Sequence, residues 1–180
     1  MHKSFLKKYF FVNSFEPNLI KCQDKNTLII YRNYENENIN QDIINLKNFC
    51  KKNRFKLFLS NNFKLALKLQ LNGAYIPSFN NKFDHLSYSL RKNFIIIGSA
   101  HNHKEIKIKQ RQKVSIIFLS SLFKKNKNYL GINKFKILTN KYKKKIVALG
   151  GIEEKNLKKI KLLNIYGIAG KRFFKKKGPF

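Results

Sequence analysis

Residues 145–156 read Lys-Ile-Val-Ala-Leu-Gly-Gly-Ile-Glu-Glu-Lys-Asn, and this stretch contains the pattern that decides the fold. Its apolar run, 146–149, has the length and composition of a buried strand. The pair Gly150 and Gly151 ends that run, and helical spacing follows, with Leu157 and Ile160 on one face. A buried strand, a glycine turn and an amphipathic helix together make one β/α unit.

The same unit recurs along the chain on both sides of this stretch. Eight short β-type runs are expected, several of them almost continuously apolar, as is typical of parallel strands covered by helices. They are residues 9–12, 27–31, 55–60, 73–76, 94–100, 114–120, 145–151 and 166–170. Segments with helical spacing lie between them, at 40–52, 63–71, 82–92, 102–109, 135–142 and 157–165. Eight strands alternating with helices predict a closed (β/α)₈ barrel.

The chain is short for that fold, since 180 residues fall below the usual lower limit of about 200. The shortage lies between the first two strands, where residues 14–26 contain Pro17 and leave room for barely one helical turn. We therefore predict one small (β/α)₈ barrel domain over residues 1–180, with a shortened first helix. The basic tail, 171–180, is expected to begin as the last helix.

The formal net charge of +30 is the most conspicuous feature of the composition. Only five of the 39 basic residues are arginine, whereas nucleic-acid sites favour the bidentate contacts that arginine makes. Lys, Asn, Ile and Phe are abundant together, which is the bias that AT-rich codons produce. The charge therefore argues weakly for nucleic-acid binding, which is a remote alternative, and it favours attraction of phosphorylated small molecules.

The two cysteines, Cys22 and Cys50, predict neither a disulfide framework nor a metal site, because neither has a Cys or His at ligand spacing. The longest apolar runs, such as 94–97 and 116–119, are far shorter than the roughly 18 residues needed to span a bilayer. Lysines interrupt the start of the chain, which does not resemble a secretory leader. We expect a cytoplasmic protein with no membrane association.

The stretch 146–156 resembles the seventh strand and following loop of the thiamine-phosphate synthase and thiazole tautomerase family. Other segments are similar to this family in the same order: Leu-Ile-Ile-Tyr-Arg at 28–32, Leu-Phe-Leu-Ser-Asn-Asn at 57–62, Leu-Ala-Leu-Lys-Leu-Gln-Leu-Asn-Gly-Ala-Tyr-Ile at 65–76, Ile-Ile-Gly-Ser-Ala-His at 96–101 and Asn-Ile-Tyr-Gly-Ile-Ala at 164–169. The resemblance covers roughly residues 9–174. It implies a barrel with its active site at the C-terminal ends of the strands, and a transferase that joins hydroxymethylpyrimidine diphosphate to a thiazole phosphate. That reaction releases pyrophosphate with help from Mg²⁺.

Four residues are candidates for phosphate binding. Gly150 and Gly151 end a strand just before a helix, where backbone N–H groups can approach an anion; a tight turn alone would also explain them. Ser99 matches a serine that contacts phosphate in the family. Arg32 ends the second strand, and its planar fork suits a diphosphate, although a salt bridge at the rim of the core is an equal reading.

Two residues are candidates for catalysis. His101 is on the same side of the fifth strand as Ser99, because strand side chains alternate, and it is the evident acid–base group for a tautomerase-type reaction. A buried, hydrogen-bonded role competes with this, and a metal site with His103 has little support. Lys125 lies in the loop after the sixth strand, where Lys125 or Lys127 could supply a cationic contact that the family's own motif has lost.

The metal half of the family's site is altered in this sequence. Its acidic ligands after the third and fourth strands correspond to Asn61 and Asn80, which are neutral. An amide is a poorer ligand for Mg²⁺ than a carboxylate because it lacks charge. The family's Gln and Lys around Arg32 are replaced by Ile30 and Tyr34. Mg²⁺ is thus implied by the resemblance and put in doubt by these replacements.

Together these observations predict a divergent thiamine-phosphate synthase-like protein that binds a thiazole phosphate or thiamine phosphate. Two alternatives stay open beside it. One is a barrel that binds a phosphorylated ligand without turnover. The other is a thiazole tautomerase-like isomerase that depends on His101.

Overall fold

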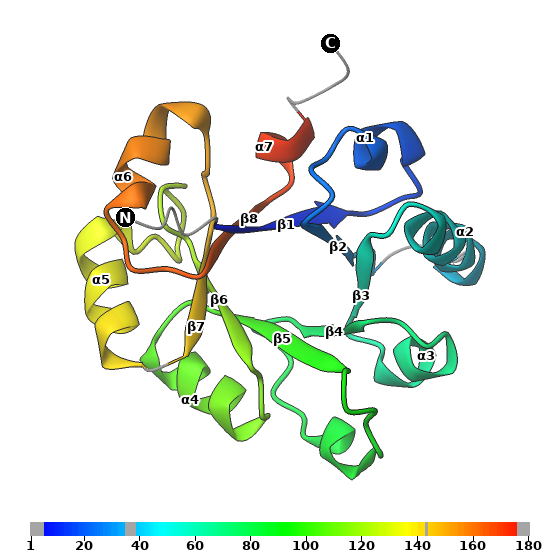
Figure 1. The fold of residues 1–180 in the computed structure, drawn as a ribbon. Coiled ribbons are helices and arrows are strands. Elements are labelled where there is room, and N and C mark those ends of the chain that lie inside the picture. The colour runs from blue at the N-terminus through cyan, green and yellow to red at the C-terminus, as the bar shows by residue number, and fades with distance from the viewer. Residues whose placement is uncertain (1–5, 35–38, 143, 176–180) are drawn as a thin grey trace.

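The computed structural model describes residues 6–34, 39–142 and 144–175 of the chain. Eight parallel strands close into a barrel in the order β1 to β8, so the predicted (β/α)₈ fold is confirmed (Figure 1). The strands are β1 (Lys7–Val12), β2 (Thr27–Tyr31), β3 (Lys56–Ser60), β4 (Gly73–Ile76), β5 (Ile95–Ala100), β6 (Ile116–Ser120), β7 (Lys145–Leu149) and β8 (Gly167–Gly170). All eight lie within one or two residues of their predicted bounds.

The helices form an incomplete outer ring around the barrel (Figure 1). They are α1 (Pro17–Lys21), α2 (Ile39–Lys52), α3 (Phe63–Lys68), α4 (His103–Arg111), α5 (Gly131–Lys141), α6 (Leu157–Lys161) and α7 (Arg172–Lys175), with 3₁₀ turns η1 (Asp84–Ser87) and η2 (Glu154–Asn156). The shortened first helix is confirmed, since α1 holds five residues and starts at a proline. The prediction of a helix over 82–92 is wrong, because only the single turn η1 forms there.

The basic tail, 171–180, begins as the short helix α7, as predicted, and residues 176–180 lie outside the described residues. No helix within the described ranges combines the length and apolar character that crossing a membrane requires.

The inside of the barrel is filled by one side-chain cluster, separate from the shell between strands and helices. Phe118 lies at its centre, with ring centroids 4.8 Å from Tyr9, 6.0 Å from Phe11 and 5.7 Å from Tyr75. Small residues make room for these rings. A Cβ on Gly73, for example, would lie 2.7 Å from the ring of Phe58. A closed core of this kind leaves chemistry to the ends of the strands, where the loops begin.

Alternation along the strands decides which side chains reach that end of the barrel. On β5, Ile95 and Ile97 belong to the interior cluster, so Ser99 and then His101 continue on the same side. On β2, Leu28 and Ile30 are interior in the same way, and the residue two places further is Arg32. The C-terminal ends of the strands and the loops that follow them are called the mouth of the barrel below. Because Ser99, His101 and Arg32 follow the interior apolar residues of these strands, the layer of side chains between the aromatic core and the mouth is polar.

Candidate functional site

Arg32 and Ser99 are brought together at the mouth by Tyr75. The side chains of Ser99 and Arg32 both lie beside the Tyr75 hydroxyl, where each favours its ionised form. Tyr75 is fully buried, and burial raises its pKa to about 12, so the hydroxyl stays protonated. Arg32 itself is exposed, and its guanidinium lies 4.5 Å from the centroid of the Phe11 ring. A fixed, solvent-facing guanidinium beside a serine hydroxyl is an arrangement that can hold a phosphate.

An aromatic pair forms the rim next to this cluster. The Tyr34 hydroxyl lies 2.9 Å from Ser60 Oγ, and the Tyr34 ring contacts Phe79 edge-on with centroids 5.7 Å apart. Both rings are exposed, Tyr34 by 51% and Phe79 by 65%. Burial of the hydroxyl raises the pKa of Tyr34. Sequence reasoning missed Phe79 and named Tyr34 only as a replacement, because nothing local in either stretch indicates that the loops after β2 and β4 meet.

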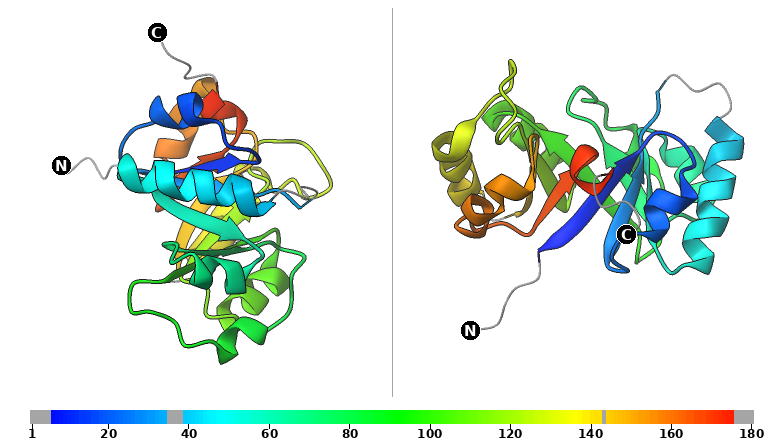
Figure 2. Two further views of the ribbon diagram at one scale, coloured as in Figure 1. Left: turned by 90° about the vertical axis from the view of Figure 1, so that its right-hand side faces the viewer. Right: turned by 90° about the horizontal axis from the view of Figure 1, so that it is seen from above.

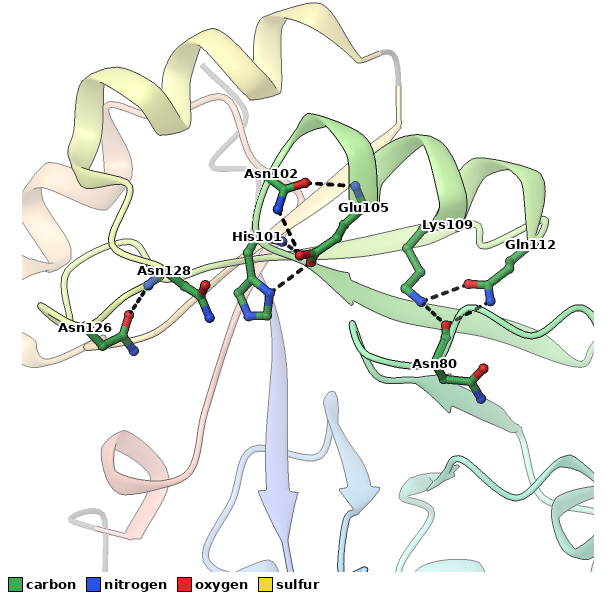
Figure 3. Close-up of polar contacts among 8 residues, drawn as sticks. All are labelled: Asn80, His101, Asn102, Glu105, Lys109, Gln112, Asn126 and Asn128. Atoms are coloured by element: carbon green, nitrogen blue, oxygen red, sulfur yellow. Dashed lines mark hydrogen bonds and ion pairs between the residues drawn. The ribbon is translucent and has the colours of Figure 1, made fainter.

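His101 is held by a carboxylate that the sequence analysis did not single out. Glu105 Oε2 accepts from the backbone N–H of His101 at 2.8 Å and lies 2.9 Å from its Nδ1 (Figure 3). Asn102 caps α4 by accepting from the Glu105 N–H and donates to the same carboxylate. The spacing His-x-x-x-Glu at the start of a helix was the signal that could have found this pair. A second histidine, His103, is occupied elsewhere by the hydroxyl of Tyr142.

The two glycines bring the loop after β7 against the loop after β6. Gly150 and Gly151 have φ of +97° and +74°, a region that suits glycine. A Cβ would lie 2.4 Å from Ser121 Oγ at Gly150 and 2.5 Å from Lys124 N at Gly151. Gly150 and Gly151 therefore do form a tight turn, as one of the two interpretations of the pair predicted. Within the described residues, the N–H groups of Gly151 and Ile152 donate to no backbone carbonyl, so an anion could meet them.

Lys125 lies on that neighbouring loop, 121–130, which projects beyond the barrel (Figure 2). The base of the loop is closed by Ser121 N donating to Asn128 O at 2.9 Å and Leu130 N donating to Ser121 O at 2.9 Å. Lys125 is exposed, as is Lys127. The structure therefore places Lys125 on a projecting loop rather than within the Arg32, Tyr75 and Ser99 cluster.

The residues at the metal position do not fit a divalent cation. Asn80 Nδ2 donates to Asn61 Oδ1 at 2.6 Å, and Asn80 Oδ1 accepts from the Lys82 N–H at 2.8 Å. Each of the two amide oxygens therefore already accepts a hydrogen bond, whereas a bound cation would need a lone pair of the same oxygen. In the described ranges no group of three His, Cys, Asp or Glu side chains gathers to hold a metal. The pocket beside the pair, of about 430 Å³, has one carboxylate in its lining, Asp84.

Behind Asn80 lies a lysine that is entirely buried (Figure 3). The ammonium of Lys109, from α4, donates to Asn80 O at 2.8 Å and to Gln112 Oε1 at 2.9 Å. The Gln112 amide donates to Asn80 O at 3.0 Å and to Lys82 O at 2.7 Å. Burial lowers the pKa of Lys109 to about 8, and the charge of Glu105 acts in the opposite direction. These bonds tie the loop after β4 to α4.

Comparison with known proteins identifies the family to which this chain belongs. Residues 19–173 match the family model described as thiamine monophosphate synthase. The chain belongs to that family. The predicted resemblance is thus confirmed, and it connects the chain to thiamine biosynthesis and to a family of transferases.

Curated relatives of the family match over much of the chain. A thiamine-phosphate synthase of Hydrogenobaculum sp. is 22% identical over 143 residues, 77% of this chain and 67% of that protein. A putative thiamine-phosphate synthase 2 of Aquifex aeolicus is 28% identical over 130 residues, 69% of this chain and 68% of that protein. At this identity, the individual site residues of this family member have to be judged from its own geometry.

Solved structures agree on the fold. Thiamine phosphate pyrophosphorylase from Pyrococcus furiosus matches with a TM-score of 0.75 and 16% identity, covering 97% of this chain and 94% of that chain. A citrate synthase variant matches with a TM-score of 0.67 and 11% identity, covering 92% of this chain and 86% of that chain. Since barrels of different activity superpose almost as well, the fold alone does not choose the reaction.

Proposed function

We propose that this member of the thiamine monophosphate synthase family binds thiazole phosphate at the mouth of its barrel and joins it to hydroxymethylpyrimidine diphosphate, releasing pyrophosphate. The observation that carries the proposal is the gathering of Arg32 and Ser99 around the Tyr75 hydroxyl, with the Arg32 guanidinium 4.5 Å from the centroid of the Phe11 ring. A phosphate needs several donors that converge on it, and the fold supplies them from β2, β4 and β5.

In this proposal Arg32 gives two parallel N–H donors to one anionic group, and Ser99 gives a hydroxyl. The ring of Phe11 supports the guanidinium at 4.5 Å, which keeps the side chain over the core while its donors face solvent. The N–H groups of Gly151 and Ile152 supply a second anion site after β7. Exposed Lys125 is the candidate for a cationic contact to the leaving diphosphate.

The rim would receive the ring of the ligand. Tyr34 and Phe79 offer two exposed aromatic faces next to Arg32, and aromatic rings attract one another in stacked or edge-on arrangements. A phosphorylated heterocycle has both parts, a charged group and a flat ring. The juxtaposition of a guanidinium and an aromatic rim therefore supports this ligand class over a simple phosphate ion.

A second function is favoured by the His101 and Glu105 pair. A carboxylate on Nδ1 orients an imidazole so that Nε2 is free to move a proton. A thiazole tautomerase-type isomerisation needs one such group near the ring. A barrel that binds the same ligand without turnover is the third reading, and it needs neither His101 nor a leaving group.

Synthase activity is the first test. Purified protein would be incubated with hydroxymethylpyrimidine diphosphate and thiazole phosphate, with Mg²⁺ and with EDTA, and thiamine phosphate would be detected as fluorescent thiochrome. Arg32→Gln is the test variant. Arg54→Gln is its matched control, since Arg54 is exposed at the opposite end of the strands, before β3.

The proposal predicts product with the wild type and Arg54→Gln and a loss of at least about tenfold in kcat/KM with Arg32→Gln. Binding of thiazole phosphate, followed by calorimetry, would run in parallel. Binding without product would reject the synthase and leave the isomerase and the non-catalytic barrel. Absence of both binding and product from folded protein would reject the proposed ligand.

A further inference from the structure

The loops after β3 and β4 are joined to each other by side-chain amides rather than by a charged centre. The Asn61 and Asn80 side chains meet directly at 2.6 Å, and the second amide oxygen accepts from the backbone of Lys82. Each oxygen that a hard dication would use therefore already accepts a hydrogen bond, and neither side chain brings negative charge.

A positively charged side chain contacts the loop after β4, where it would oppose the binding of a metal cation. Lys109 is 0% exposed, and its ammonium donates to the carbonyl of Asn80. Figure 3 shows the ammonium on the α4 side of the loop, with the carbonyl directed toward it. Two positive groups sharing one short loop repel each other. The nearby lysines Lys64 and Lys82 line the same pocket and add to this field.

The loop is also fixed without any ion. Gln112 donates to the carbonyls of Asn80 and Lys82, and the Nε2 of His85 lies 2.8 Å from Gln112 O. Phe63 stacks on His85 with ring centroids 4.6 Å apart, which ties η1 to the start of α3. The loop that a metal would otherwise order is thus held by α4.

We propose that this barrel takes no divalent cation at Asn61 and Asn80, that the Lys109 ammonium and the Gln112 amide fix the loop after β4 in its place, and that a phosphorylated ligand is bound without Mg²⁺. The part that concerns the ligand rests on the proposed function. Lys109 is a positioning residue in this scheme, because it acts through the loop and not on the ligand.

The metal alone is the first probe. Binding of Mn²⁺ would be followed by the loss of the free-ion signal in electron paramagnetic resonance, with wild type, Asn61→Asp with Asn80→Asp, and the same pair with Lys109→Met. The control pair, Asn140→Asp with Asn164→Asp, adds the same charge at exposed positions near the other end of the barrel.

We expect no saturable Mn²⁺ binding by the wild type or the control pair. The acidic pair should bind at least about tenfold more tightly than the control pair, and removing Lys109 should tighten it further. Saturable Mn²⁺ binding by the wild type would overturn the inference. So would an acidic pair that binds no more tightly than the control pair, or whose affinity the added Lys109→Met leaves unchanged.

Ligand binding gives the second readout. Thiazole phosphate would be titrated by calorimetry with 5 mM EDTA and with Mg²⁺, using about millimolar concentrations. Equal affinity in both supports the inference, and affinity that appears only with Mg²⁺ overturns it. If no binding occurs in either condition, the proposed function fails, and the Mn²⁺ experiment still decides the metal part on its own.

Discussion

The Nδ1 of His101 lies 2.9 Å from Glu105 Oε2, and the same carboxylate oxygen accepts from the His101 backbone N–H. One carboxylate therefore holds both the main chain where β5 ends and the ring of the first residue beyond it. The Nε2 atom of the imidazole remains for a second partner. The orientation of the ring is set by Glu105 of α4 instead of by a ligand.

Replacing Glu105 by Gln tests what this pair does. The amide can still accept from the backbone, but it no longer selects the Nδ1–H tautomer. We expect nitrogen NMR of the wild type at pH 8 to show the proton on Nδ1 of His101, and Glu105→Gln to shift the population toward Nε2–H. Any isomerase activity on thiazole phosphate should fall about tenfold or more in kcat with little change in KM. A wild-type ring with its proton on Nε2 would contradict the arrangement.

Removal of the Tyr75 hydroxyl tests the phosphate cluster. Tyr75→Phe keeps the ring contacts to Phe11 and Phe118 and deletes the hydroxyl beside which Arg32 and Ser99 both lie. We expect the dissociation constant for thiazole phosphate to rise about tenfold and stability to fall by about 1 kcal/mol. Tyr142→Phe is the control, since it also loses a bonded hydroxyl, at the end of α5. Equal effects of the two variants on ligand affinity would argue against the cluster.

The aromatic rim should matter for the ring of the ligand and little for folding. Phe79 is 65% exposed, so Phe79→Ala should change the free energy of unfolding by no more than about 0.5 kcal/mol. Affinity for thiazole phosphate should fall about three- to tenfold, with affinity for inorganic phosphate unchanged. Ile137→Ala, at a position 67% exposed on α5, serves as the comparison. An equal loss for inorganic phosphate would remove the rim from the ring site.

The glycine pair is predicted to be structural as well as available to an anion. Gly151→Ala would place a methyl group 2.5 Å from the backbone N of Lys124 at a φ of +74°. We expect a loss of about 2 kcal/mol or more in urea unfolding. Gly170→Ala meets nothing nearer than 3.7 Å and should cost less than about 1 kcal/mol. Equal stability of the two variants would mean that the loops after β6 and β7 can separate freely.

Cys50 gives a pH dependence with a defined sign. Burial raises the pKa of its thiol from 9.0 to about 12, whereas the unfolded chain ionises near the lower value. Between these values the folded state binds more protons, so stability falls as pH rises, by about 1.4 kcal/mol for each unit. The stability difference between wild type and Cys50→Ala should therefore shrink from pH 8 to pH 11 in urea unfolding. A constant difference would mean that the thiol is reached by solvent in the native state.

Much of this molecule follows from its sequence alone. Short, nearly continuous apolar runs identified all eight strands, because a buried parallel strand is apolar on both faces. The order of the motifs identified the family. The wrong prediction of a helix over 82–92 has a physical cause. The spacing of Leu86 and Leu90 favours a helix, but the segment forms a hydrogen bond between His85 and Gln112, at the end of α4, instead.

The sequence by itself determined the barrel, its short first helix and the loss of acidic ligands at Asn61 and Asn80. Only the tertiary structure decided that these two amides bond to each other, that Lys109 lies behind them, and that Arg32 and Ser99 gather beside Tyr75. Each of these contacts joins residues from different β/α units. Closure of the barrel sets their distances, and no local pattern of residues records that closure.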